Sequence, residues 1–393
     1  MHVAALYDLS PALRLLLIGG LLASGPLLMV YLRTRRASPL GRLHALTLVT
    51  LFLTFDLVLF GAFTRLTDSG LGCPDWPGCY GNASPIGASA PIDAAQQAMP
   101  TGPVTPGKAW VEMVHRYLAM GVGMLTLVLA VFAWLQPKPR DGPRVMSPWW
   151  ATLTAVWVCI QGAFGALTVT MKLFPAIVTL HLLGGYVLLG LLTVQAALLA
   201  RQQYPAPVPA LSNVVGSLRT WAALALLLLA LQAASGAWVS SNYAVLACSE
   251  FPKCQASWWP QMDFDQGFQI WRPLGYLRDG SHISFQALTA IHFMHRLLAG
   301  VTVTVLAGLA YYLVNRQPLR NHGRALGALL GLQLATGLSN VVLDWPLVAA
   351  VLHTGGAGAL AIVLVRLLEA IYAVAPSTKS ADSSGSTPFG LRA

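Results

Sequence analysis

The chain has 393 residues, of which 56% are hydrophobic and only 10% are charged, and its formal net charge is +10. About a quarter of the residues in a soluble domain are charged, so this composition excludes a soluble globular protein and indicates an integral membrane protein. The positive charge is concentrated in short loops between apolar runs, which membrane topology explains and which argues against nucleic-acid binding.

Nine apolar runs are each long enough to cross a bilayer as a helix of about 20 residues. In chain order they are 14–32, 46–64, 111–135, 149–170, 177–200, 219–240, 287–314, 324–343 and 347–371. Arg and Lys residues gather in the alternate loops 33–42, 136–148, 201–219 and 315–324. The positive-inside rule predicts that these loops are cytoplasmic and that the long loops 65–110 and 241–286 are external.

Two cysteine loops reveal an internal repeat. "CPDWPGC" at 73–79 aligns with "CSEFPKC" at 248–254 after a shift of 175 residues. The His-Arg pair of "EMVHRYLAMG" (112–121) aligns with that of "HFMHRLLAG" (292–300) after a shift of 180. A shift of 172 then aligns Gln161, Gly165 and His181 with Gln333, Gly337 and His353.

Each repeat contains four predicted helices, an even number, so both repeats have the same orientation in the membrane. The expected fold class is therefore an all-α integral membrane protein of two pseudo-symmetric four-helix transmembrane bundles, with an extra N-terminal transmembrane helix. We predict an anchor helix with its basic loop over 1–42, the bundles over 43–203 and 204–375, and a disordered cytoplasmic tail over 376–393.

One histidine lies a few residues inside the external end of each of four spans: His115, His181, His295 and His353. Helices that face each other in a bundle commonly build cofactor sites, and two imidazoles on opposite sides of a haem are a common arrangement. The glycines that follow His181 and His353 leave room for a broad macrocycle. A single intramembrane histidine is often only a helix–helix hydrogen-bonding residue, but four at repeat-related positions favour ligands.

The two repeats differ three residues before the first histidine. The first has Glu112, which projects from nearly the same helix face as His115, whereas the second has His292. A carboxylate at this place either moves protons during an oxidation or is simply an interfacial group in contact with water.

Three arginines lie near the external ends of the spans: Arg116, Arg296 and Arg65. They either pair with the propionates of a bound haem or snorkel from a helix end towards water, and both alternatives predict the same sequence pattern.

The matched cysteines lie in loops predicted to face an oxidising compartment, so we expect the disulfides Cys73–Cys79 and Cys248–Cys254. Zinc sites are less well supported because each loop has only two sulfurs. The disulfides either relay electrons or fasten the loop as a structural staple.

The chain resembles the haem A synthase family of cytochrome oxidase assembly over about residues 46–371. The resemblance depends on "TRLTDSGLG" (64–72), "EMVHR" (112–116), "VTLHLLGG" (178–185), "AIHFMHR" (290–296), "VLHTGG" (351–356) and the cysteine pairs. It implies a membrane enzyme that oxidises the C8 methyl group of haem O to the formyl group of haem A. The run 14–32 is a departure, because the family has eight core helices.

The resemblance also implies roles for residues. His115 and His181 would bind the haem O substrate, His295 and His353 would bind the iron of a haem B cofactor, and Glu112 would be the catalytic carboxylate. It further implies a bacterial inner membrane location with the haem pockets on the periplasmic side. The implied partners are haem O synthase, oxidase assembly factors and a redox partner. Whether the chain forms a homo-oligomer stays open.

Two other functions are compatible with the pattern. A non-catalytic dihaem b-type electron carrier would use the same ligands, but such carriers generally stack their haems towards opposite membrane faces, whereas these histidines share one side. A haem transporter would need a polar pathway at the membrane midplane, where the sequence offers little beyond Asp56.

Overall fold

The computed structural model describes residues 10–136, 146–203 and 215–374. Every element of regular secondary structure assigned within these ranges is a helix. They are α1 (Ser10–Thr34), α2 (Pro39–Leu66), α3 (Ser89–Ala98), α4 (Pro106–Leu135), α5 (Pro148–Thr170), α6 (Pro175–Gln203), α7 (Val215–Ser241), the 3₁₀ helix η1 (Ala244–Ala247), α8 (Phe264–Gly267), α9 (Phe285–Val314), α10 (Arg320–Val342) and α11 (Leu347–Val374). Nine of these described helices are long and apolar enough to cross a membrane, which confirms the predicted fold class. The predicted disordered tail lies outside the described residues.

The helices that carry His115 and His295 begin at side-chain caps. Thr105 precedes Pro106 at the start of α4, and its Oγ1 accepts a hydrogen bond of 3.2 Å from the Lys108 amide. The Ser284 hydroxyl caps α9 in the same way. Such caps satisfy amides that have no partner inside the helix, and they fix where each helix begins at the end that carries the cysteine loops.

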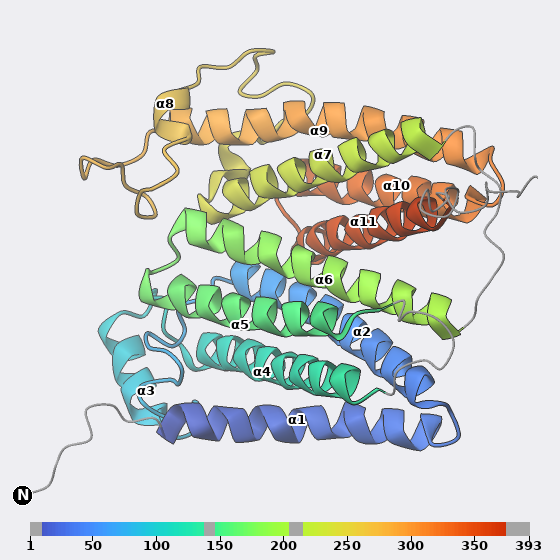
Figure 1. The fold of residues 1–393 in the computed structure, drawn as a ribbon. Coiled ribbons are helices and arrows are strands. Elements are labelled where there is room, and N and C mark those ends of the chain that lie inside the picture. Colours follow the sequence, from blue (N-terminus) through green and yellow to red (C-terminus); the bar gives the residue numbers. More distant parts are fainter. Residues whose placement is uncertain (1–9, 137–145, 204–214, 375–393) are drawn as a thin grey trace, which may run out of the picture.

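Two groups of four helices lie side by side (Figure 1). Helices α2, α4, α5 and α6 contact one another around a closed ring, and α7, α9, α10 and α11 make the corresponding contacts in the same cyclic order. Helices α6 and α11 pack against each other, and each also contacts the first helix of the other bundle. The two bundles are therefore related by a pseudo-two-fold axis between them, as a parallel repeat requires.

Polar contacts join the two bundles across this axis. The Tyr243 hydroxyl donates to the Asp68 carboxylate at 2.5 Å, and Arg65 Nη2 donates to the Ser240 carbonyl at 2.5 Å. Both contacts join positions that are 175 residues apart, which is the shift of the repeat at this point. Repeat-related residues can touch only near the axis, so these contacts locate it at the C-terminal ends of α2 and α7.

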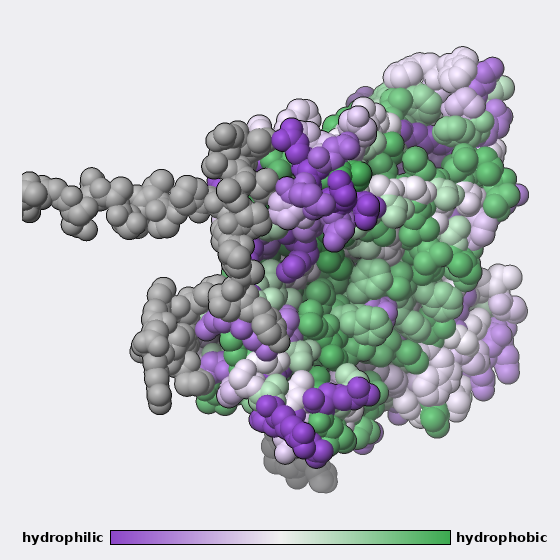
Figure 2. Space-filling view, turned by 90° about the vertical axis from the view of Figure 1, so that its right-hand side faces the viewer, coloured by the Kyte–Doolittle hydropathy of each residue, from purple (hydrophilic) through white to green (hydrophobic). Residues whose placement is uncertain are grey.

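Helix α1 lies outside the first bundle and packs on α4 (Figure 1). Gly19 permits this close approach, because a Cβ there would lie 2.7 Å from the Met120 side chain. The loop from α1 to α2 lies at the opposite end of the molecule from the cysteine loops (Figure 1). A view onto the end that carries the α1–α2 loop shows groups of hydrophilic residues beside a hydrophobic surface (Figure 2).

Candidate functional site

The four histidines occupy equivalent places near the beginnings of α4, α6, α9 and α11, and each ring lies against a glycine of a neighbouring helix. The pairs are Gly61 with His115, Gly165 with His181, Gly236 with His295 and Gly337 with His353. A Cβ at Gly61 or Gly236 would lie 3.0 Å from the Cε1 atom of the ring. Glycine therefore provides the space that the imidazole occupies between two helices.

Within each bundle the two imidazoles share one region. His115 and His181 are close enough to interact electrostatically, and so are His295 and His353. These are the pairs that the sequence predicts to face each other. Their coordination of iron stays a prediction.

The glycines that follow the histidines have a different use from the one expected. A Cβ at Gly184 would lie 1.9 Å from Gln161 Nε2, and one at Gly356 would lie 2.1 Å from Gln333 Nε2. Gln333 also donates to the His353 carbonyl at 3.0 Å. These glycines therefore accommodate a glutamine of the neighbouring helix, so this part of the backbone is covered by protein.

Glu112 is buried beneath the first cysteine loop, with 3% of its surface exposed. Its Oε2 accepts a hydrogen bond of 2.7 Å from the Cys73 amide, and its Oε1 forms an ion pair of 2.5 Å with Arg116 Nη2. Both oxygens are thus oriented by charge-assisted contacts, which are shorter and stronger than neutral hydrogen bonds. The loop and the carboxylate form one unit beside His115.

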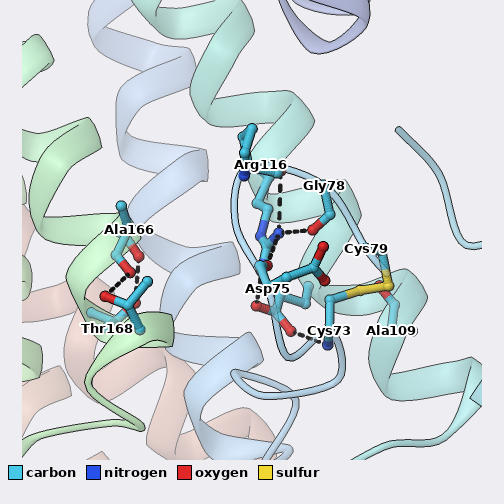
Figure 3. Close-up of polar contacts among 12 residues, drawn as sticks. Cys73, Asp75, Gly78, Cys79, Ala109, Arg116, Ala166 and Thr168 are labelled. Carbon is cyan, nitrogen blue, oxygen red and sulfur yellow. Dashed lines mark hydrogen bonds and ion pairs between the residues drawn. A yellow bond between two sulfur atoms is a disulfide. The ribbon is translucent and has the colours of Figure 1, made fainter. Parts of the chain in front are cut away.

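The side chain of Arg116 holds the first cysteine loop by binding backbone carbonyls of that loop (Figure 3). Its Nη1 donates to the carbonyls of Asp75 at 3.0 Å and Pro77 at 3.2 Å, and also to the carbonyl of Gly78. The Asp75 carboxylate in turn accepts from the amides of Tyr80 and Gly81, at 2.6 and 2.7 Å. The loop is therefore built around one buried cation and one carboxylate.

The second cysteine loop repeats this design with one change. Arg296 donates to the carbonyls of Glu250 at 2.7 Å, Lys253 at 3.2 Å and Cys248 at 2.5 Å. In place of the carboxylate, His292 Nε2 accepts from Arg296 Nε at 3.2 Å. Within the residues that the structure describes, a buried acid therefore lies beneath the first cysteine loop and not beneath the second.

All three arginines considered for propionate binding have protein partners. Arg116 and Arg296 bind loop carbonyls, whereas Arg65 pairs with Asp68 at 3.1 Å and lies over the Tyr243 ring at 4.1 Å. Snorkelling alone does not describe these contacts, because the guanidinium groups bind defined protein atoms. Propionate binding stays a prediction for those guanidinium N–H groups of the three arginines that these protein contacts do not use.

The cysteine sulfurs lie at bonding distance, 2.07 Å for Cys73–Cys79 and 1.97 Å for Cys248–Cys254. All four side chains are buried, whereas Cys159 is a free and exposed cysteine in α5. The short Cys–Cys loops and the arginine contacts favour a structural staple.

Labelling of the unfolded chain with a maleimide is expected to modify one thiol without reductant and all five after reduction. Cys159 is the internal positive control, since it should react in both samples. Labelling of more than one thiol in the unreduced mature protein would contradict the two disulfides.

The sequence patterns did not draw attention to a set of polar residues beside the second histidine pair. Ser235 Oγ lies 2.8 Å from His295 Nδ1, and Thr336 Oγ1 lies 3.0 Å from His353 Nδ1. The Gln232 amide nitrogen is 3.1 Å from the same His295 nitrogen. The repeat alignment contains the signal, because the positions aligned with Ser235 and Thr336 are phenylalanines in the first bundle.

In the part of the chain that the structure describes, membrane-length helices form two related bundles, each with a pair of half-buried histidines. This arrangement defines a multi-pass membrane protein with a duplicated histidine site. The profile of the COX15-CtaA family, described as "Cytochrome oxidase assembly protein", matches residues 44–365, and the chain belongs to that family.

Curated relatives support the same grouping. The chain is 38% identical to a Shewanella oneidensis protein named "Heme A synthase", in a match that covers 81% of this chain and 93% of the relative. A protein of the same name from Methylorubrum populi is 27% identical, with 90% and 92% covered. Another, from Halalkalibacterium halodurans, is 27% identical, with 76% and 86% covered.

Proposed function

We propose that this chain is a haem A synthase that oxidises the C8 methyl group of haem O to a formyl group, for assembly of a terminal oxidase. Family membership and the printed names of the relatives support this function. The observation that carries it is the pair of related histidine sites, only one of which lies beside a buried acid. A reaction that consumes one haem and retains another requires such unequal sites.

The N-terminal bundle receives haem O between His115 and His181, and the C-terminal bundle holds haem B between His295 and His353. The residues fit a haem because each bundle brings two imidazoles together near the external ends of its helices. Haem B, when bound, supplies one-electron redox chemistry. The histidines bind and orient the macrocycles, and the apolar helices around them exclude water.

Glu112 is the proton-accepting group of the reaction. Two successive two-electron oxidations with water as the oxygen donor convert the methyl carbon into a gem-diol, which loses water to leave the formyl group. The four electrons pass to the redox partner, and four protons are released. Protons must leave the substrate in these steps, and a positioned carboxylate can take them. The Cys73 amide and Arg116 hold Glu112 in one orientation beside the substrate pocket.

The chain lies in the inner membrane of a bacterium, with its cysteine loops and haem pockets on the periplasmic side. The positive-inside rule supports this orientation, since the arginine-rich loop between α1 and α2 is at the opposite end. Haem O synthase, oxidase assembly factors and a redox partner are the expected partners.

Extraction of haem from membranes tests the function. Cells that express this chain together with a source of haem O are expected to contain haem A or hydroxylated haem O, detected by chromatography and mass spectrometry. Cells without that source should yield neither product. Haem B alone in both pockets, despite an available supply of haem O, would favour the electron carrier instead.

A further inference from the structure

Each of the paired histidines of the C-terminal bundle has a hydroxyl partner at Nδ1. The Ser235 hydroxyl donates its own hydrogen to the Gln232 carbonyl at 2.8 Å, and the Thr336 hydroxyl donates to the Leu332 carbonyl at 2.8 Å. Each hydroxyl oxygen is then an acceptor for the histidine Nδ1–H, at 2.8 and 3.0 Å. Gln232 Nε2, which lies 3.1 Å from the same His295 nitrogen, donates to the His295 carbonyl at 3.3 Å. These contacts favour the tautomer in which Nε2 is free to bind a metal.

The N-terminal bundle lacks this arrangement. Within the described ranges, the Nδ1 atoms of His115 and His181 are buried and have no hydrogen-bond partner. The shifts of the repeat align Ser235 with Phe60 and Thr336 with Phe164. Phe60 instead stacks on the His115 ring, with centroids 6.3 Å apart and planes inclined by 9°.

The backbone setting of the histidines is otherwise alike. Hypothetical Cβ atoms at Gly61 and Gly236 lie 3.0 Å from Cε1 of His115 and His295 respectively, so the rings approach these glycines with the same edge. For His115 and His295, the difference between the bundles is thus the partner of Nδ1 and not the position of the ring. One hydroxyl in the second bundle replaces one phenyl ring in the first, at both ligand positions.

We propose that Ser235 and Thr336 are positioning residues that make the C-terminal pair a permanent holder of haem. Phe60 and Phe164 leave the N-terminal pair without this support, so that its haem can exchange. This inference rests on the proposed function, in which one haem stays while the other enters as substrate and leaves as product.

The physical reason is the effect of the outer hydrogen bond on the metal ligand. An acceptor at Nδ1–H fixes the orientation of the ring and makes Nε2 a stronger base, and loss of such partners typically lowers metal affinity by about 10–100-fold. A more basic ligand also favours ferric over ferrous iron, so it lowers the reduction potential. An imidazole whose Nδ1 has no hydrogen-bond partner, as in His115 and His181, is free of both effects.

Release of ferric haem to an excess of haem-free myoglobin provides the test, with the purified full chain in detergent. The C-terminal pocket is isolated in a His115→Ala/His181→Ala background and loaded with haem B. Adding Ser235→Ala and Thr336→Val is expected to increase the release rate about 10-fold or more. The reduction potential of the remaining haem is expected to become more positive.

The reciprocal change tests the other half of the proposal. Phe60→Ser and Phe164→Thr, in a His295→Ala/His353→Ala background, are expected to slow haem release from the N-terminal pocket. Thr304→Val in α9 and Ser339→Ala in α10 are matched controls, because their exposed hydroxyls bond only to carbonyls of their own helices. Size-exclusion profiles and circular dichroism identify any variant that does not fold.

Two outcomes separate this inference from the proposed function. Unchanged release rates and potentials in folded Ser235→Ala/Thr336→Val protein, with haem lost from His353→Ala, would overturn the inference and leave the ligand assignment standing. Retention of the same haem in a folded His353→Ala variant would overturn both.

Discussion

Replacement of Glu112 by Gln is expected to lower haem A formation by about 10²–10⁴-fold, the usual contribution of a positioned acid or base. The amide cannot accept a proton, but it has nearly the same shape and can still accept a hydrogen bond from the Cys73 amide. The loop should therefore stay in place and both haems should remain bound. The measurement is the ratio of haem A to haem O extracted from membranes that express the variant.

Asp93→Asn is the matched control for this experiment. Asp93 is also a carboxylate near the cysteine-loop end of the molecule, but it lies exposed on α3, so its loss should leave haem A formation unchanged. Normal turnover in Glu112→Gln protein would show that Glu112 is not the proton acceptor. Loss of haem together with activity would instead indicate that the charge of Glu112 is needed to build the pocket.

Replacement of His295 by Ala is expected to abolish the low-spin absorption spectrum of the C-terminal haem. The ring is a proposed axial ligand, and no other imidazole of the bundle occupies the same position between α7 and α9. Reduced-minus-oxidised difference spectra of purified protein would measure the loss. An unchanged spectrum would contradict the ligand assignment.

The substitution Gly236→Val is expected to displace the His295 ring while leaving the histidine in the chain. The new side chain would enter the space of the His295 imidazole, because even a Cβ lies 3.0 Å from Cε1. We expect a shifted or lost low-spin spectrum. Gly300→Val in α9 is the control, since no atom lies within 4 Å of a Cβ at Gly300.

These predictions describe a duplicated scaffold with divided tasks. The arginine that follows the first histidine of each bundle holds a disulfide loop in both, so this element is shared. Among the described residues, the buried acid lies only in the first bundle, and the hydroxyl partners of the histidines lie only in the second. Each difference replaces one side chain at a repeat-related position and leaves the helices where they are.

Much of the fold follows from local features of the sequence. A run of about 20 apolar residues can satisfy its backbone in lipid only as a helix, which is why the spans are readable without a structure. The shifts of 175 and 172 residues then relate the bundles and place the four histidines at equivalent heights. The cysteine pairing is also local, because each pair is separated by six residues.

Only the tertiary structure decided what the polar side chains contact. The sequence gives no sign that Arg116 binds loop carbonyls, that Glu112 accepts from the Cys73 amide, or that Gln161 fills the space at Gly184. Hydropathy determines which segments enter the membrane, but it is almost indifferent to rotation of a helix about its axis. Contacts between helices depend on that rotation and on how the long cysteine-containing loops fold back, and both are set by packing between residues far apart in the chain.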